Sequence, residues 1–418
     1  MLKLFQRIIS TSFAPNVEPD DVYIALKQIV FSCLNSENKK PIKEIKDWFC
    51  NFYQTRHCYL FSSGRAALYY LLKALGIEPG SEIIVQALTC VAVPNSIIWN
   101  GLKPIYVDVD KTSLNLDVAD LEKKISTKTK AIIIQHTFGI PADIKAINKI
   151  AAKHKLLLIE DCAHCLGGEY QGGKLGSFGD VSFFSFGRDK MVSSVFGGAI
   201  VTKNISLAKK LSYYENKLTT APKSFVLKQL LYNPVYFLGL LLYPVLIGKL
   251  IIKSSFHFNL LSKAVFDEEK RGSMPAFINF QFSWHLGALI LNQLSKIDKN
   301  IFHRRQISEV YRKSVKTTGF GDKDTVFLRY PTITSKKNEV LAYAKHNNIH
   351  LGDWYRTPIA PIRDKFADFY YYLGVCPNAE NIAQKIINLP THINISVQDA
   401  NKICSFINSL GTKLENGY

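Results

Sequence analysis

Residues 56–203 alternate between two kinds of apolar pattern, and this alternation allows few folds. Short runs of β-branched and other apolar residues are separated by longer stretches with helical spacing. The strand-like runs begin at Glu82, Pro104, Ala131, Leu156, Asp180 and Gly198. Helix-like stretches include 66–76 and 141–155. Nearly continuous apolar strands that alternate with helices predict an α/β domain built around a mainly parallel sheet.

The chain has 418 residues, of which 47% are apolar, and this length favours two domains over one. We expect a large α/β domain over residues 12–275 and a smaller α+β domain over 276–418. Residues 284–316 have amphipathic helical spacing, and short strands alternate with helices from about residue 320 onward.

The segment 216–266 does not fit either pattern. Its 51 residues contain six lysines and no aspartate or glutamate, and residues 229–248 carry no charge. A 20-residue apolar stretch could cross a bilayer as a helix, but Pro234 and Pro244 interrupt this one. A single span would also separate the two domains. We therefore predict a re-entrant hairpin or an interfacial element that contacts anionic membrane through 222–266. The alternative is an insertion that packs on protein.

The formal net charge of +18 favours an anionic partner, such as a phosphorylated substrate or a membrane surface. Basic residues are spread along the chain without a nucleic-acid motif, so we expect no nucleic-acid partner. Cys162 and Cys165 form a CxxC with no second pair, and we expect no metal site. The eight scattered cysteines, together with an N-terminal run unlike a signal peptide, indicate the cytoplasm.

Two residues at the expected carboxyl edge of the sheet suit a pyridoxal phosphate site. Asp161 ends one apolar run, and Lys190 follows the next one. Ligands bind at this edge in open α/β sheets. The lysine amine could form a Schiff base, and the carboxylate could keep the pyridine nitrogen protonated. His164 would lie near the ring edge or the phenolic oxygen.

A phosphate site is predicted where the chain turns into the first helix-like stretch. Ser63 and Gly64 precede that helix, whose unpaired N–H groups and dipole favour an anion. Ser-Gly at this position is also a common helix cap. The guanidinium of Arg65 could reach the same phosphate, or remain at the surface. The Ser185 hydroxyl, which precedes Lys190, could bind phosphate as well.

From about residue 12 to its end, the chain resembles the DegT/DnrJ/EryC1/StrS family of pyridoxal phosphate-dependent sugar aminotransferases. The motifs that carry the resemblance are SSGRAAL at 62–68, VQALTCVAVPNSI at 85–97, PIYVDVD at 104–110, HTFGIPADI at 136–144, IEDCAH at 159–164, FSFGRDKMVSSVFGGA at 184–199, NFQFSWHLGALILNQL at 279–294 and LPTHINIS at 389–396. The resemblance implies the fold-type I architecture of pyridoxal phosphate-dependent transferases.

The resemblance also implies the role of each site residue. Lys190 is the Schiff-base lysine, and Asp161 is the acid that binds the pyridine nitrogen. The other cofactor-binding positions are Gly64 and Arg65 through their backbone amides, His164, Ser185, and Asn279, which reaches the phosphate of a second subunit. A homodimer with shared active sites is therefore implied.

Five positions depart from the family pattern. Cys90 stands where an aromatic residue usually stacks on the cofactor ring, and Gly187-Arg188 replaces a frequent His-Pro pair. Gln281 and Phe196 replace an arginine and an acid. The segment 216–266 is longer and more apolar than is usual. These differences indicate a divergent subgroup.

We therefore expect an aminotransferase that moves an amino group, by resemblance from glutamate, onto a keto sugar that is typically nucleotide-linked. Cell-envelope or secondary glycan synthesis is the expected setting. One alternative is a sugar dehydratase with the same cofactor, although in such relatives a histidine takes the place of the lysine. The other is a non-catalytic, membrane-associated sensor or scaffold, which an intact Lys190 and Asp161 argue against.

Overall fold

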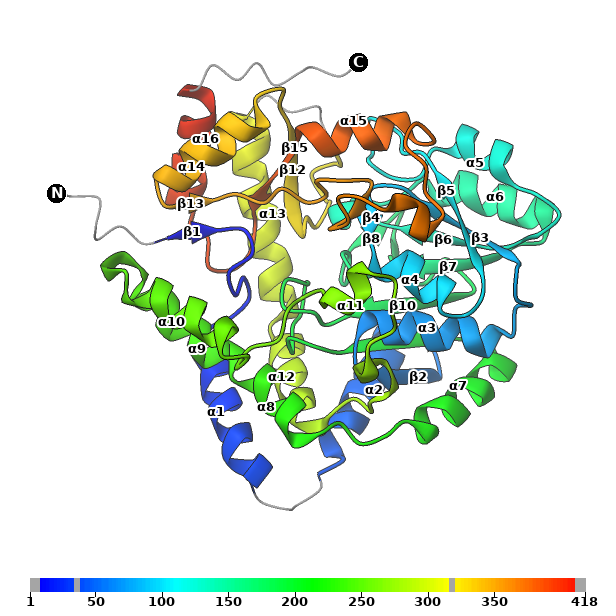
Figure 1. The fold of residues 1–418 in the computed structure, drawn as a ribbon, viewed down its shortest axis with the longest axis horizontal. Coiled ribbons are helices and arrows are strands. Elements are labelled where there is room, and N and C mark those ends of the chain that lie inside the picture. The colour runs from blue at the N-terminus through cyan, green and yellow to red at the C-terminus, as the bar shows by residue number, and fades with distance from the viewer. Residues whose placement is uncertain (1–7, 34–37, 316–319, 410–418) are drawn as a thin grey trace.

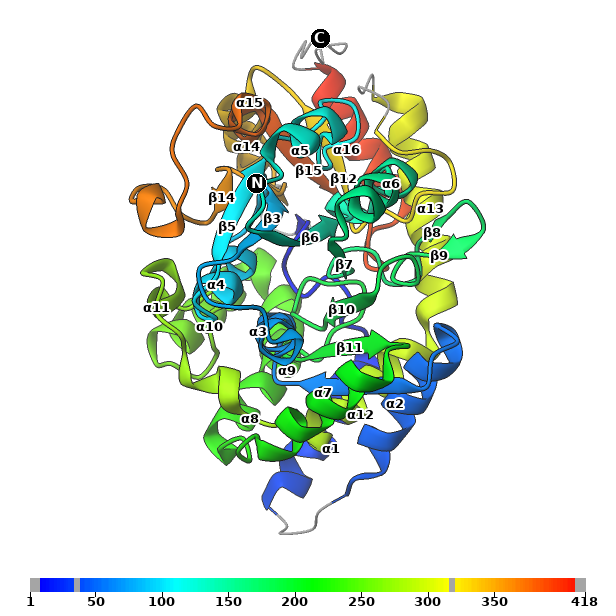
Figure 2. The same ribbon diagram turned by 90° about the vertical axis from the view of Figure 1, so that its right-hand side faces the viewer.

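The computed structural model describes residues 8–33, 38–315 and 320–409. Residues 1–7, which hold much of the N-terminal run considered above, lie outside this range, as does the end of the expected C-terminal domain. A seven-stranded sheet runs through the middle of the molecule (Figures 1 and 2). Its strands, in spatial order, are β2 (His57–Phe61), β11 (Gly198–Thr202), β10 (Val181–Ser185), β7 (Leu157–Asp161), β6 (Thr129–Gln135), β3 (Glu82–Gln86) and β5 (Lys103–Val107).

The sheet is mainly parallel, as the sequence predicts. Strand β11 is antiparallel to both of its neighbours, and the pairs from β10 to β5 are parallel. The six predicted strands are all present, while β2 adds a seventh that the sequence patterns did not reveal. Strand side chains alternate between two faces. Ile84, Ile132 and Leu158 share a core with helices on one face, and Ile83, Ile133 and Ile159 belong to the larger core on the other.

Helices cover both faces of the sheet. Those of the α/β region are α2 (Lys40–Phe52), α3 (Gly64–Leu75), α4 (Ala92–Ile98), α5 (Val118–Lys124), α6 (Ile144–His154) and α7 (Ile205–Lys217). Helix α3 begins where the Ser63 hydroxyl accepts a hydrogen bond from the Ala66 N–H, and it ends at Gly76 in the left-handed region, with φ of 69°. The helix therefore ends at Gly76, as the sequence predicts, in a left-handed conformation that glycine adopts easily.

The C-terminal region forms a smaller α+β unit beside the sheet (Figure 1). Its elements are α13 (Ile297–Ser314), β12 (Arg329–Ile333), α14 (Lys337–His346), β13 (Ile349–His350), β14 (Ile359–Ala360), α15 (Pro377–Lys385), β15 (Ile386–Pro390) and α16 (Val397–Ser409). Strand β12 pairs antiparallel with β15, and β13 pairs with the N-terminal strand β1 (Ile9–Ser10). Strand β14 pairs with β4 (Thr89–Cys90) of the large region. The N-terminal helix α1 (Pro19–Cys33) packs against α12 (Trp284–Ser295), which also contacts α2.

The segment 216–266 folds as a series of short helices. These are α8 (Lys223–Leu230), α9 (Tyr232–Leu241), the turn η3 (Tyr243–Val245) and α10 (Ile247–His257), followed downstream by α11 (Asp267–Lys270) and η4 (Ala276–Asn279). Pro234 lies in the first turn of α9 and Pro244 lies in η3, so both occupy positions that tolerate proline. Helices α9 and α10 form a hairpin. Among the described residues, no helix is long and apolar enough to cross a membrane.

Candidate active site

The phosphate site predicted at the start of α3 lies against the end of β10. A Cβ atom placed on Gly64 would approach the Ser185 Cβ to 2.7 Å and its Oγ to 2.9 Å. Gly198 of β11 packs equally closely on the Ser63 carbonyl. These contacts bring the Ser185 hydroxyl to the N-terminus of α3, where unpaired backbone N–H groups favour an anion. The arrangement fits a phosphate group.

Lys190 lies on the same loop and turns back toward Ser185. Its backbone N–H donates to the Gly187 carbonyl at 3.1 Å. The ideal Cβ position of Gly187 is 3.5 Å from both the Lys190 Cγ and the Ser185 Oγ, so only a glycine separates the two side chains. The Lys190 charge also favours ionisation of Asp161 and of Asp189, which shows that it lies near both carboxyl groups. Lys190, Ser185 and Asp161 therefore belong to one site.

Asp161 ends β7 with its side chain buried. Burial raises the pKa of its carboxyl group, against the opposing effects of a 3.0 Å hydrogen bond from the Ala163 N–H and of the Lys190 charge. A buried carboxylate is costly unless a cation or donors compensate it. A protonated pyridine nitrogen would supply such a cation, so the environment of Asp161 fits the role that the sequence predicts.

His164 packs beside two aromatic rings that sequence reasoning did not identify, and these two rings also contact each other. Its ring is 5.9 Å from that of Phe138 and 6.1 Å from that of Tyr355, in stacked orientations. The Nδ1 atom accepts a hydrogen bond from the Phe138 N–H at 3.3 Å, so the neutral ring donates from Nε2 to the Tyr355 hydroxyl, also at 3.3 Å. Burial, Lys190 and Arg329 hold the pKa of His164 well below its usual value. The ring is therefore neutral at physiological pH.

The guanidinium of Arg65 points away from the expected phosphate and toward the segment that follows the hairpin. It binds the carboxylate of the fully buried Glu269 and donates to the Ala264 carbonyl at 2.7 Å. It also lies over the rings of Phe277 at 5.4 Å and Phe196 at 5.9 Å. The guanidinium therefore has an anionic partner within the chain, and the backbone amide is the part of Arg65 left to contact a phosphate.

The two residues that replace the His-Pro pair have different surroundings. Gly187 lies between Ser185 and Lys190. Arg188 donates to the Ser262 carbonyl at 2.7 Å and stacks over the Tyr232 ring at 4.8 Å. Both of these partners belong to the segment 216–266. The insertion is thus attached directly to the loop that carries Lys190.

Two further contacts hold the lysine loop, and no sequence pattern predicts either of them. Asp189 forms an ion pair with Arg329 of β12, which is almost fully buried and links the loop to the C-terminal unit. Asn16 donates from Nδ2 to the backbone carbonyls of Lys190 and Met191, and its side-chain Oδ1 accepts from Arg304 at 2.9 Å. The position of Lys190 therefore depends on the N-terminal segment and on both units.

Cys90 lies close enough to Arg65 and Lys190 for their charges to act on its thiol, although burial dominates and raises its pKa. Strand β4 presents it beside Ala360 of β14. Asn279 lies elsewhere, exposed at the end of η4, where its Oδ1 accepts from the Tyr70 hydroxyl at 2.7 Å. The described contacts of Asn279 do not join it to the Lys190 group of the same chain.

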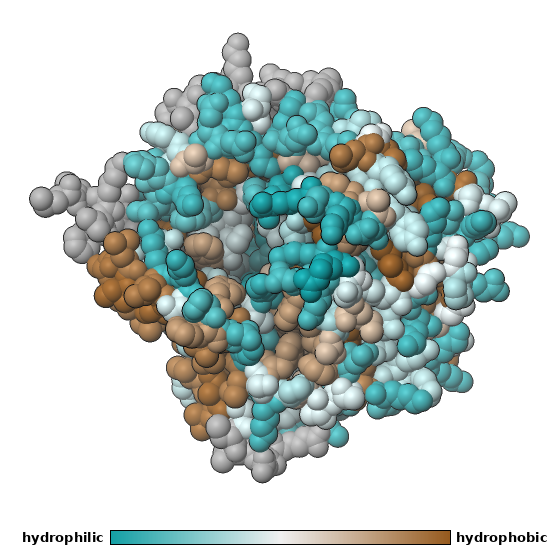
Figure 3. Space-filling view, in the orientation of Figure 1, coloured by the Kyte–Doolittle hydropathy of each residue, from teal (hydrophilic) through white to brown (hydrophobic). Residues whose placement is uncertain are grey.

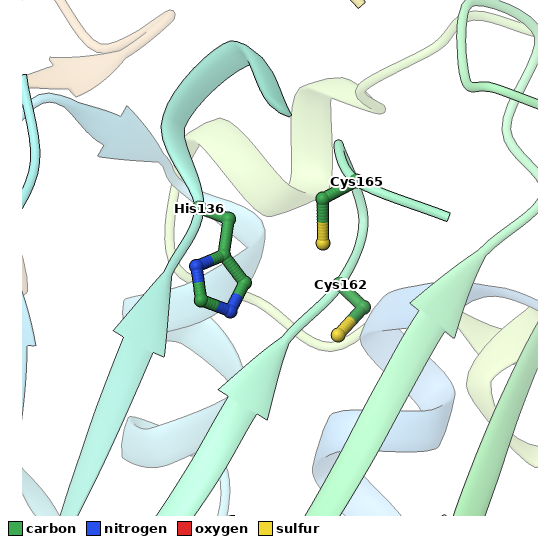
Figure 4. A group of neighbouring side chains, drawn as sticks. All are labelled: His136, Cys162 and Cys165. Carbon is green, nitrogen blue, oxygen red and sulfur yellow. The ribbon is translucent and has the colours of Figure 1, made fainter. Parts of the chain in front are cut away.

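Figure 4 shows His136, Cys162 and Cys165, whose potential ligand atoms lie within 4.8 Å of one another. The His136 ring already uses both nitrogens, because Nδ1 accepts from the Ala142 N–H at 3.2 Å and Nε2 faces Glu160 at 3.3 Å. Burial also raises the pKa of both thiols, which disfavours the thiolate form that metals need. The group is therefore a poor metal site and lies beside Asp161 as part of the core.

Comparison with known proteins decides the family. The sequence profile of the DegT/DnrJ/EryC1/StrS aminotransferase family matches residues 27–229 and 260–408. The chain belongs to this family. It is a pyridoxal phosphate-dependent sugar aminotransferase, as the motifs predict. The unmatched residues between the two ranges contain the whole α9–η3–α10 hairpin.

Relatives of known activity match the aminotransferase over nearly its full length. It is 27% identical to GDP-perosamine synthase of Escherichia coli O157:H7 over 396 residues, which cover 91% of this chain and 94% of that protein. It is also 27% identical to dTDP-4-amino-4,6-dideoxy-D-glucose transaminase of Shigella dysenteriae, over 95% of this chain and 97% of that one. The crystal structure of DesV from S. venezuelae has the same fold, with a TM-score of 0.74 and 21% sequence identity. The match covers 96% of this chain and all of that chain.

Proposed function

We propose that the enzyme transfers an amino group from glutamate to the keto carbon of a nucleotide-linked sugar. The geometry that carries this proposal is the convergence of Lys190, Asp161 and the Gly64–Ser185 contact at the carboxyl edge of the sheet. The two relatives named above, a GDP-perosamine synthase and a dTDP-amino sugar transaminase, support a nucleotide-linked acceptor. Their names also favour a place in glycan synthesis.

Each residue has a distinct proposed task. Pyridoxal phosphate, when bound, supplies an electrophilic carbonyl and a ring that withdraws electrons from the reacting carbon. The Ser185 hydroxyl and the backbone amides of Gly64 and Arg65 hold its phosphate. Lys190 would hold the cofactor through Nζ, and its amine, when not bonded to the cofactor, would move the proton at the donor α-carbon.

Asp161 and His164 have different proposed roles at the cofactor ring. The Asp161 carboxylate keeps the pyridine nitrogen protonated, because a buried carboxylate is stabilised by an adjacent cation. His164, neutral and held by contacts with Phe138 and Tyr355, packs at the ring edge without adding charge. In place of the aromatic residue that is missing at Cys90, these rings provide the apolar wall of the site.

Replacement of the lysine tests the reaction. Lys190→Ala is expected to lose both turnover and the visible absorbance of the covalently bound cofactor, because no other described amine replaces Nζ at this position. Lys209→Ala, at an exposed site on α7, is the matched control and is expected to retain both. Assays with a keto sugar nucleotide and glutamate would follow 2-oxoglutarate release. Transamination by Lys190→Ala would overturn the assignment.

We also propose a homodimer in which Asn279 reaches the phosphate of the partner subunit. Its exposed position and its separation from the Lys190 group support this role. Mixing of Lys190→Ala and Asn279→Ala subunits tests the idea. A mixed dimer would contain one site with both residues intact, so mixing is expected to restore activity that neither variant has alone. If Asn279 acts within its own chain, mixing restores nothing.

The enzyme is proposed to act in the cytoplasm, where segment 222–266 contacts the inner face of the membrane. The support for this location is the apolar and acid-free composition of the segment together with its exposure in the fold.

A further inference from the structure

The α9–η3–α10 hairpin presents apolar side chains to solvent. Figure 3 shows them gathered at the left edge of the molecule. Leu241 is 68% exposed and Leu250 is 64% exposed, and the other exposed members of this tip are Phe237, Leu238, Val245, Leu246 and Ile247. Contiguous apolar surface of this kind marks a binding surface on a folded protein.

The hairpin is a rigid structure whose two helices pack backbone to backbone. A Cβ atom on Gly248 would lie 1.9 Å from the Gly239 carbonyl oxygen, and one on Gly239 would lie 2.7 Å from Ile252. The Gly248 N–H donates to the Leu242 carbonyl at 3.0 Å. Such close approach requires glycine in both helices. The apolar tip is therefore held in a defined shape.

One side of the hairpin is attached to the body of the protein, along α9 and at the turn η3. Tyr236 and Tyr243 pack against Phe13, with ring centroids 6.1 and 6.5 Å apart. Near the start of the hairpin Tyr232 lies against Arg188, and beyond its end Ser262 binds the same side chain. The hairpin is thus held to the body at its turn, and residues at its two ends contact the loop of Lys190.

The lysines beside the apolar residues indicate what kind of partner this surface binds. Lys249 and Lys253 of α10 are exposed beside the apolar residues, and residues 216–266 contain no acid to neutralise them. A second copy of the chain would present the same lysines and no acid from its own residues 216–266, so pairing of two such tips would bring like charges together. An anionic lipid surface accepts both the lysines and the apolar side chains.

The dimensions limit how deeply the hairpin can enter. Helices α9 and α10 have 10 and 11 residues. At about 1.5 Å per residue each is about 15–17 Å long, roughly half of the ~30 Å hydrocarbon core of a bilayer. The tip can therefore enter one leaflet without crossing the membrane. The family profile leaves residues 230–259 unmatched, so this device is an addition to the shared fold.

We propose that the α9–η3–α10 hairpin is a wedge that docks this enzyme on an anionic bilayer, with its apolar tip in one leaflet and Lys249 and Lys253 at the headgroups. The inference deepens the proposed membrane contact and is independent of the proposed reaction. Because residues at the two ends of the wedge contact Arg188, docking would place the active-site loop at a fixed distance from the lipid surface.

Vesicle flotation tests the wedge with the purified full-length enzyme. Wild type is expected to float with vesicles of phosphatidylcholine and phosphatidylglycerol, and to float less with phosphatidylcholine alone. Leu241→Ser/Leu250→Ser is expected to lower the bound fraction about tenfold or more, since two leucines lose their burial in lipid. Lys249→Gln/Lys253→Gln is expected to remove the preference for the anionic vesicles.

Matched controls replace equally exposed apolar residues elsewhere. Ile205→Ser and Leu373→Ser remove side chains that are 65% and 69% exposed, and these variants are expected to float like wild type. Equal flotation of wild type and the leucine variant, or a change from dimer to monomer in the leucine variant on size exclusion, would overturn the wedge. Transamination measured in vesicle-free solution is expected to be unchanged in all of these variants, which separates this test from that of the reaction.

Discussion

Asp161 offers the sharpest test at the level of single residues, because its role depends on its charge. Asp161→Asn preserves the shape of the side chain but cannot keep a pyridine nitrogen protonated. We expect turnover to fall about a hundredfold or more, as when a preorganised electrostatic contact is lost. The absorbance spectrum of the bound cofactor should shift as well, which a purely structural role would not cause.

The control for Asp161→Asn is Asp143→Asn. Asp143 caps α6 by accepting the Ala146 N–H at 3.1 Å, and asparagine caps a helix equally well. This variant should keep both its spectrum and its activity. A normal spectrum in Asp161→Asn would show that the carboxylate does not face the ring nitrogen.

The close contact between Gly64 and Ser185 leads to a second prediction about single residues. In Gly64→Ala the new methyl group would meet the Ser185 side chain at 2.7 Å, and the required shift should destabilise the fold by about 1–3 kcal/mol. The double variant Gly64→Ala/Ser185→Gly removes the atoms that clash, so it should recover most of this loss. Its affinity for the cofactor should stay low because the hydroxyl is gone.

Ser185→Ala separates the effect on stability from the effect on cofactor binding, because it removes the hydroxyl and keeps the Cβ atom. It should weaken cofactor binding without a change in the urea midpoint of the cofactor-free protein. If the double variant is as unstable as Gly64→Ala, the close approach of α3 to β10 is not the cause of the instability.

Among the elements, α11 is coupled to α3 by one buried ion pair. The Glu269 side chain is fully buried and that of Arg65 is 14% exposed, so loss of one partner leaves a largely buried charge without its counterion. Glu269→Gln should therefore lower the free energy of unfolding by about 3 kcal/mol or more. Glu268→Gln changes the exposed neighbour and should have little effect. Urea denaturation of both variants measures the difference, and similar midpoints would contradict the coupling.

The strands of the sheet and the segment 216–266 show what the sequence could predict. The apolar runs that begin at Glu82 and Gly198 coincide with strands because each is buried on both faces of the sheet, which makes the pattern strong. Strand β2, from His57 to Phe61, was not predicted because its five residues mix polar and aromatic side chains. The two prolines correctly argued against one long helix in the segment 216–266.

Contacts between distant parts of the chain could not be predicted. Local pattern says nothing of partners such as Asn16 for the Lys190 carbonyl, or Arg329 for Asp189, because the fold alone brings them together. Arg65 illustrates the limit. Its neighbours in sequence suggest a phosphate ligand, yet a carboxylate that lies 204 residues away holds its guanidinium. Residue types at the carboxyl edge of the sheet were predictable, but the side chains that position them were not.

For the whole molecule, the histidines predict how stability depends on pH. Burial holds the pKa of His164, His303 and His350 below the usual value, and it lowers that of His285 to about 4 from 6.5. The unfolded chain therefore binds more protons than the folded one below pH 6.5. The free energy of unfolding should be nearly constant from this pH to about pH 8, below the ordinary pKa of a thiol, and should decrease as the pH falls toward the folded pKa.

His285 isolates one part of this effect. Its Nδ1 faces the Gln28 Oε1 at 3.0 Å, a contact that the amide of a glutamine can replace. His285→Gln removes the titrating group, so its urea midpoint should decline less steeply than that of wild type between pH 6.5 and about 4.5. This window lies above the range in which most carboxylates titrate. Parallel decline of the two proteins would show that His285 has the same pKa in the folded and unfolded states.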